Sequence, residues 1–259
     1  MDDMLTPVGA ADAMSIDRFA NEISFRLLRP SARLGVYPRA NVFLSRLSGK
    51  RLQLEVLNTG LPTESRTLRA RLSPLLTTPR MSTFAISAII NFAVSRMPAQ
   101  TAYVNVGVWN GFSFFAGLLG NPEVRCIGID NFEQFGSPRQ EFMTRFEQLR
   151  TPNASFYDMD YQAYFEEVHE GPIGFYFYDG HHAYEHQLQG LQTAEPFFVP
   201  GTVILVDDTN WDEPRRATLD FAAARPGRYE VVVDRRTADN EHPTLWNGIM
   251  MLVDKGAPA

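Results

Sequence analysis

The sequence lacks several features that mark particular classes of protein. It has one cysteine, Cys126, so no disulfide can form within the chain, and a lone cysteine in an apolar run suits a reducing compartment. No stretch approaches the roughly 20 apolar residues that a membrane-spanning helix needs. The first residues, MDDMLTP, are acidic and do not have the pattern of a signal peptide. We therefore expect a soluble, cytoplasmic protein without a membrane partner.

Basic runs and several cofactor motifs are also missing. The chain has 24 Lys and Arg against 30 Asp and Glu, a net charge of −6, which argues against nucleic acid as the main partner. No lysine follows the glycine turn described below in the Walker pattern, which argues against hydrolysis of a nucleoside triphosphate. The 259 residues, 44% of them hydrophobic, are enough for one large α/β domain with an appendage.

From about residue 101 onward, short apolar runs alternate with amphipathic segments. This alternation predicts a mostly parallel sheet with helices on both faces, a doubly wound Rossmann-like α/β fold. The expected strands cover residues 102–107, 124–129, 154–158, 173–178, 202–206, 229–233 and 245–253. The expected helices cover 113–120, 138–150, 161–168, 184–196 and 213–224.

The first hundred residues have a different character. Residues 15–30 predict an amphipathic helix that ends at Pro30, and residues 81–97 predict a helix too apolar for a surface. We expect the second helix to pack on the sheet or on a second subunit. Residues 1–80 are interpreted as a helical cap or dimerisation arm of a homodimer or larger homo-oligomer, and residues 81–259 as the main domain.

Two of the apolar runs end in acidic residues. The run at 175–178 leads into Asp179, and the run at 203–206 leads into Asp207 and Asp208. Because ligands bind beyond the carboxyl ends of parallel strands, the three carboxylates are expected to converge there. Such carboxylates repel one another unless a cation lies among them. The sequence therefore predicts a cation site, although capping of the next helix remains an alternative for the Asp pair.

A glycine turn, VNVGVWNGFS, follows the first strand of this domain. Gly107 lets the backbone turn tightly, Gly111 lets a ligand approach, and Ser113 lies near a helix N-terminus that favours anionic groups. Trp109 stands where a fuller motif has a middle glycine, so a plain turn remains an alternative. Asp130 ends the next strand, at the usual interval for an acid that binds the ribose hydroxyls of an adenosine-type ligand.

The segment DGHHAYE places two histidines directly after Asp179. Histidine is the side chain best suited to act as a general base near neutral pH. His181 and His182 are adjacent, so both rings cannot point the same way, and one of them serves structure or faces solvent. Zinc is disfavoured because no second cysteine or HExxH helix is present, whereas oxygen ligands favour magnesium, calcium or manganese.

Four segments, in this order and spacing, resemble class I S-adenosylmethionine-dependent methyltransferases: VNVGVWNGFS, IGIDNFEQFG, YDGHHAYE and PGTVILVDD. More narrowly, they are similar to the macrocin-type sugar O-methyltransferases of natural-product pathways, to which cephalosporin-hydroxylase-like proteins are related. The resemblance covers roughly residues 80–253. It implies a seven-stranded sheet whose last strand is antiparallel.

The resemblance also implies roles for individual residues. It implies a magnesium ion at Asp179, Asp207 and Asp208, with His182 as the base that takes the proton of the acceptor hydroxyl. The family often has an acid where Asn105 stands, so the charge attraction for the donor's amino group is lost here. The candidate donor-binding residues are Asn105, Gly107, Trp109, Asn110, Gly111, Ser113, Asp130, Asn131 and Asp179.

These residues favour a magnesium-dependent O-methyltransferase that uses S-adenosylmethionine and acts on a hydroxyl of a small molecule. One alternative is a methyltransferase of the same fold whose acids bind substrate hydroxyls without a metal. Another is a non-catalytic protein that binds an adenosine ligand. A nicotinamide-dependent dehydrogenase also fits the glycine turn and Asp130, but it leaves the strand-end acids unexplained.

Overall fold

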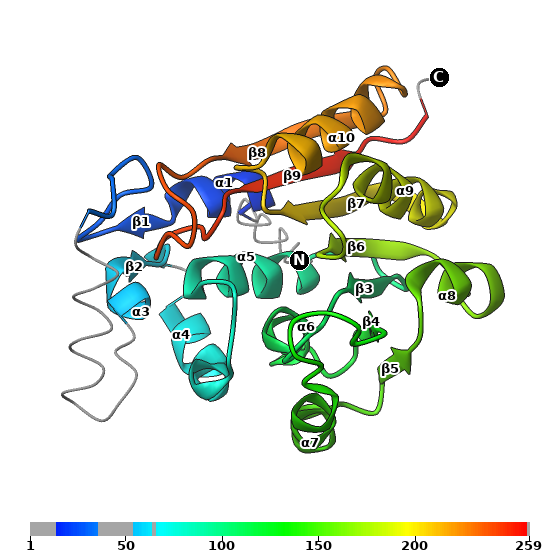
Figure 1. Ribbon diagram of the computed structural model, residues 1–259, viewed down its shortest axis with the longest axis horizontal. Helices are drawn as coiled ribbons and strands as arrows, with labels where there is room; N and C mark the ends of the chain where they lie inside the picture. Colours follow the sequence, from blue (N-terminus) through cyan, green and yellow to red (C-terminus); the bar gives the residue numbers. More distant parts are fainter. Residues whose placement is uncertain (1–13, 36–53, 64–65, 258–259) are drawn as a thin grey trace, which may run out of the picture.

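A seven-stranded sheet forms the centre of the computed structural model, which describes residues 14–35, 54–63 and 66–257 (Figure 1). The strand order is β5-β4-β3-β6-β7-β9-β8. The strands are β3 (Ala102–Val106), β4 (Arg125–Asp130), β5 (Ala154–Asp158), β6 (Ile173–Tyr178), β7 (Phe198–Asp207), β8 (Tyr229–Arg235) and β9 (Ile249–Asp254). Both neighbours of β9 pair with it antiparallel, and the other pairs are parallel. The predicted sheet, with its antiparallel last strand, is confirmed.

Helices cover both faces of this sheet. One face packs against α1 (Ile16–Glu22), α5 (Phe84–Val94), α6 (Phe112–Leu118) and α7 (Arg139–Leu149). The other face packs against α8 (Tyr161–Glu167), α9 (Tyr184–Ala194) and α10 (Asp212–Ala223). Side chains of β6 alternate between the two cores: Phe175 and Phe177 face the first, and Tyr176 and Tyr178 face the second. The strand is therefore buried on both faces, as its continuous apolar run predicts.

The apolar helix α5 is buried along its whole length. Thr83 caps it, because its side-chain oxygen accepts a hydrogen bond from the backbone N–H of Ile86. The helix packs against α1, α6 and the sheet. The expectation that it packs on the sheet is confirmed, and the burial is complete within one chain.

The amino-terminal segment differs from its prediction. The helix expected over 15–30 ends at Glu22, because Ser24 and Phe25 form β1 and pair with β2 (Thr59–Gly60). Just beyond β1, the side chain of Asn58 accepts hydrogen bonds from the backbone N–H groups of Leu27 and Leu28. These partners lie about thirty positions away in the sequence, so a local helical pattern cannot reveal them.

The other elements in the described part of this segment are short. They are α3 (Leu54–Asn58), α4 (Arg66–Leu72) and a 3₁₀ helix at Ser73–Thr77. The start MDDMLTP and residues 36–53 of the predicted cap or arm lie outside the described residues. No helix of the part that is described is long and apolar enough to cross a membrane.

The last predicted strand begins later than expected. Residues 245–248 form a loop before β9, and within it Trp246 and Gly248 have positive φ angles of 52° and 83°. Left-handed backbone of this kind cannot continue a strand. The strand prediction for 245–248 is therefore wrong, and the loop places Trp246 and Asn247 at the cavity described next.

Candidate active site

A cavity of about 460 Å³ lies at the carboxyl ends of the parallel strands. Among the predicted residues, it is lined by Gly107, Trp109, Asp130, Asn131, Asp179, His181, His182 and Asp208. Its lining includes six carboxylates, from Asp130, Glu133, Asp160, Asp179, Asp208 and Glu241, and no Lys or Arg among the described residues. The cavity therefore favours ligands with positive charge.

Gly107 brings the ends of two strands together. Its φ angle is 81°, and a Cβ atom there would overlap the backbone carbonyl of Asp179. The backbone N–H of Asp179 donates to the carbonyl of Val106, at 3.0 Å. Only glycine allows this close approach, so Gly107 sets the position of Asp179 at the cavity wall.

Other residues of the glycine turn lie beneath the cavity and do not line it. Gly111, with φ 89°, precedes α6 and packs against the ring of Phe115, so its role is close packing and not the approach of a ligand. The side chain of Asn105 is fully buried, and its Oδ1 accepts a hydrogen bond from Ser113 Oγ at 3.0 Å. Asn110 Oδ1 accepts one from Arg145. These residues brace the turn from below.

Asp130 holds the turn from the cavity side. Its Oδ2 accepts a hydrogen bond from the backbone N–H of Trp109, and its Oδ1 accepts one from Phe132, both at 2.7 Å. Burial raises the pKa of Asp130, although these hydrogen bonds oppose the shift. Each carboxylate oxygen keeps a second lone pair, so Asp130 can still accept hydrogen bonds from a ligand in the cavity.

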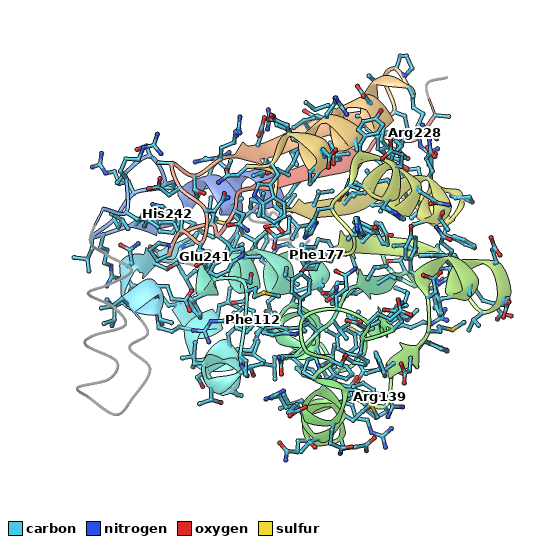
Figure 2. The ribbon with its side chains drawn as sticks, viewed as in Figure 1. Phe112, Arg139, Phe177, Arg228, Glu241 and His242 are labelled. Carbon is cyan, nitrogen blue, oxygen red and sulfur yellow. The ribbon has the colours of Figure 1, made fainter. Side chains whose placement is uncertain are left out.

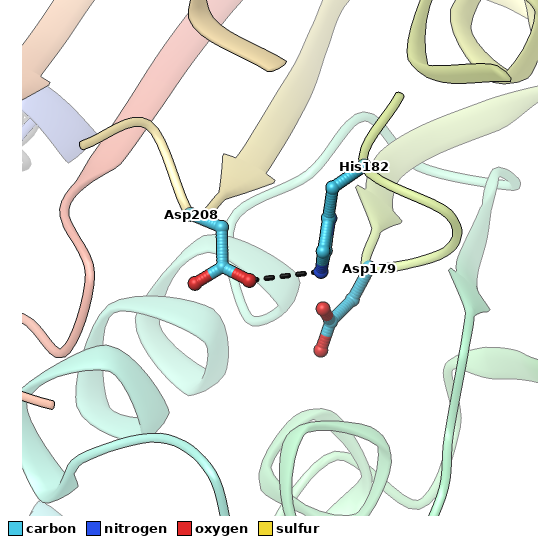
Figure 3. Close-up of side chains that lie close together, drawn as sticks. All are labelled: Asp179, His182 and Asp208. Carbon is cyan, nitrogen blue, oxygen red and sulfur yellow. Dashed lines mark ion pairs between the residues drawn. The ribbon is translucent and has the colours of Figure 1, made fainter. Parts of the chain in front are cut away.

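Asp179, His182 and Asp208 form a cluster on the other side of the cavity (Figure 3). One ligand atom from each residue lies within 4.8 Å of the others, and His182 Nε2 is 2.9 Å from Asp208 Oδ2. Asp208 has a φ angle of 59°, so the backbone turns sharply after β7. The two carboxylates at these separations fit a divalent cation, with the imidazole of His182 beside them.

The charged groups of this cluster shift one another's pKa values. Burial, and then the negative charge of Asp208, raise the pKa of Asp179 from 3.8 to about 7. Burial alone would lower the pKa of His182, but the hydrogen bond to Asp208 and the charges of Asp179 and Asp208 raise it above its ordinary value. Both groups therefore keep their protons to a higher pH than usual. In the absence of a cation, these protons reduce the repulsion between the carboxylates.

Asp207 does not belong to this cluster. It is the last residue of β7, and the alternation of the strand places it on the same face as Val203 and Leu205. Its Oδ1 accepts the backbone N–H of Asp208 at 2.9 Å. Burial, and then the charges of Asp208 and Asp179, raise the pKa of Asp207 well above its ordinary value. We therefore leave Asp207 out of the candidate ligands.

The two adjacent histidines point in different directions, as their sequence predicts. His182 faces Asp208, and its ring lies 5.1 Å from that of Trp211. His181 also lines the cavity, but its Nδ1 accepts the backbone N–H of Ala183 and its ring lies 4.5 Å from that of His186. Of the two histidines, only His182 pairs with a carboxylate of the cluster.

Several cavity residues escape the sequence reasoning. Met159, Asp160 and Tyr161 follow β5, and Trp211, Glu241, Trp246 and Asn247 come from two loops near the end of the chain. Asp160 carries a detectable signal, because an acid after a short strand commonly ends in such a crevice. It also caps α8, by accepting hydrogen bonds from the backbone N–H groups of Gln162 and Ala163.

Comparisons with known proteins agree with this geometry. Residues 104–209 match a family model described as a methyltransferase domain, and this range contains the glycine turn, Asp130 and the cluster. A search of the curated proteins finds no match.

Three solved structures share the fold. Cofactor-bound Rv0187 from MTB is 16% identical, with a TM-score of 0.54, and the alignment covers 89% of this chain and 99% of that one. The O-methyltransferase from Bacillus cereus, in complex with SAH, is 15% identical, with a TM-score of 0.51 and coverages of 86% and 100%. A protein from Corynebacterium glutamicum is 12% identical, with a TM-score of 0.53 and coverages of 88% and 99%.

Proposed function

We propose that the chain is a class I S-adenosylmethionine-dependent methyltransferase that transfers the methyl group to a hydroxyl of a small molecule with the help of magnesium. The observation that carries this proposal is the cluster of Asp179, His182 and Asp208 in the same cavity as Asp130 and the glycine turn. A donor site and a candidate cation site therefore share one space.

The donor side of the proposal rests on Gly107, Trp109, Asp130 and Asn131. Asp130 offers its free lone pairs to the ribose hydroxyls, and the turn at Gly107 leaves room beside them. The donor carries a positive sulfonium, a positive amino group and one carboxylate, and its net positive charge suits a wall rich in carboxylates. Asn105 lies beneath the turn, so its effect on the donor is to support the backbone.

The acceptor side rests on the cluster. Asp179 and Asp208 would hold the magnesium ion, whose positive charge makes a nearby hydroxyl more acidic. The imidazole of His182 would take the proton of the acceptor hydroxyl on the ring nitrogen that does not pair with Asp208, and Asp208 Oδ2, 2.9 Å from Nε2, would stabilise the imidazolium that forms. The hydroxyl oxygen then bonds to the methyl carbon while the carbon–sulfur bond breaks, which leaves S-adenosylhomocysteine. The protein contributes mainly by holding oxygen and methyl group in line.

The charge of the cavity limits the acceptor. No Lys or Arg lines the cavity in the described part of the chain, so no such side chain is available to pair with a phosphate or carboxylate on the acceptor. The rings of Trp211 and Trp246 offer apolar walls instead. We therefore propose a neutral or cationic acceptor. The narrower similarity to macrocin-type enzymes, the cytoplasmic location, the division near residue 80 and the homo-oligomer stay predictions.

Neighbouring variants test the metal part of the proposal. Calorimetric titration of the wild type with Mg²⁺, in the presence of S-adenosylhomocysteine, is expected to show one site. Asp208→Asn is expected to lose that site, whereas Asp207→Asn, a matched change one residue away, is expected to keep it. The metal-free alternative is favoured if the wild type binds S-adenosylhomocysteine but no Mg²⁺, and if methyl transfer to a hydroxyl acceptor continues at full rate with chelator.

A further inference from the structure

The loop between β8 and β9 reaches into the acidic cluster through one side chain, Asn247. We propose that Asn247 is a positioning residue, which orients the carboxylate of Asp208 for the cation. This inference rests on the proposed function, because it assigns a role in the magnesium site. Within the cluster Asn247 contacts Asp208, so it would act through that carboxylate.

Both ends of the Asn247 amide are held. Its Nδ2 donates a hydrogen bond to Asp208 Oδ1 at 2.6 Å, and its Oδ1 accepts one from the backbone N–H of Glu241 at 2.7 Å. The side chain is only 5% exposed. Because the Glu241 bond identifies which end of the amide carries the oxygen, the NH₂ group is the end that faces Asp208.

This contact fixes how the Asp208 carboxylate is turned. Oδ1 is occupied by Asn247, so Oδ2 faces His182 at 2.9 Å, on the side where Asp179 lies (Figure 3). An amide is suited to this task because it donates a hydrogen bond without adding a positive charge. A Lys or Arg at the same place would neutralise Asp208 and compete with a cation for it.

The loop that carries Asn247 is itself anchored at several points. The backbone N–H of Asn210, two residues after Asp208, donates to the carbonyl of Asn247 at 2.7 Å. At the other end of the loop, the N–H of Ala238 donates to the carbonyl of Pro30, and His242 Nε2 lies 3.0 Å from the carbonyl of Ala32.

Figure 2 shows Glu241 and His242 on this loop. The backbone near Pro30 anchors the loop at Ala238 and His242, and the loop in turn holds Asn247 through the backbone of Glu241. These separate hydrogen bonds link the end of β7, the late loop and the amino-terminal segment, and they would orient Asp208 before any ligand binds.

The test uses Mg²⁺ and S-adenosylhomocysteine as separate calorimetric probes, so no acceptor is needed. Asn247→Leu removes the hydrogen bond to Asp208 and is expected to weaken Mg²⁺ binding by about 10- to 100-fold, the usual effect of losing a partner of a metal ligand. The affinity for S-adenosylhomocysteine is expected to stay the same, because that ligand binds on the Asp130 side. Asn247→Ser, which is smaller, provides a second variant should Leu disturb folding.

Asn121→Leu is the matched control. Asn121 is also a buried amide with a hydrogen bond, from its Nδ2 to the carbonyl of Gly117, but it follows α6 at the opposite end of the sheet. It is expected to bind Mg²⁺ like the wild type. Wild-type Mg²⁺ affinity in both Asn247 variants would overturn the role of Asn247 and leave the proposed function intact. A wild type that binds S-adenosylhomocysteine but no Mg²⁺ would overturn both.

Discussion

Replacing Asp179 by Asn is expected to stabilise the metal-free protein while it destroys the cation site. Burial and the charge of Asp208 raise the pKa of Asp179 from 3.8 to about 7 in the folded chain. The folded state therefore holds this proton more tightly than the unfolded state does. Consequently the free energy of unfolding falls as the pH rises from about 4 to about 7. Above that range Asp179 is ionised in both states, and its destabilising effect on the folded state is complete.

The size of the effect follows from the shift. About three pKa units correspond to about 4 kcal/mol at 1.36 kcal/mol per unit. Asp179, Asp207 and Asp208 share their repulsion, so removal of one charge returns only part of this amount. We expect a gain of about 2 kcal/mol at pH 8, which raises Tm by about 4–8 °C in a chain of this size.

Thermal unfolding at pH 4 and pH 8, with and without Mg²⁺, measures this. Asp179→Asn is expected to exceed the wild type in Tm at pH 8 without metal, to match it near pH 4, and to gain nothing from Mg²⁺. Glu123→Gln, which removes an exposed carboxylate, serves as the control and should not change Tm measurably. The reasoning is refuted if Asp179→Asn is no more stable than the wild type at pH 8, or if its advantage is the same at both pH values.

Three further predictions concern the donor, the turn and the metal. Asp130→Asn should weaken the binding of S-adenosylhomocysteine by about 10- to 100-fold, because hydrogen bonds to a charged group contribute about 1.5–3 kcal/mol; unchanged affinity in calorimetry would remove Asp130 from the donor site. Gly107→Ala should lower the free energy of unfolding in denaturant by about 2 kcal/mol or more, since its φ is 81° and a Cβ meets the Asp179 carbonyl; wild-type stability would contradict the close approach. The affinity for Mg²⁺ should rise between pH 6 and pH 8, because the cation must displace the proton that Asp179 holds with a pKa of about 7; a flat profile would show that Asp179 is not a ligand.

Local sequence signals account for much of the fold. The strands β3 to β7 and the helices between them follow from apolar runs, caps and glycine turns, which depend on neighbouring residues only. Signals of the same kind place Asp130, Asp179 and Asp208 at the ends of their strands, and His182 in the loop after Asp179. The convergence of these ends on one cavity then follows from parallel topology.

Other features depend on contacts that no local pattern records. Whether Asp207 or Asp208 enters the cavity is decided by the left-handed backbone of Asp208, which is an uncommon conformation for a residue other than glycine. The early end of α1 depends on the pairing of β1 with β2, and the loop before β9 depends on Asn210 and the chain near Pro30. The role of Asn247 cannot be predicted from a local pattern for the same reason, because its hydrogen-bond partner Asp208 lies 39 positions away in the sequence.

The most direct test of the account is a crystal structure with S-adenosylhomocysteine and Mn²⁺, chosen because manganese gives an anomalous signal and accepts the ligands that magnesium does. The account predicts an anomalous peak between Asp179 and Asp208, with the ligand's ribose against Asp130 in the same cavity. A structure with S-adenosylhomocysteine bound and no manganese at these two carboxylates would contradict it.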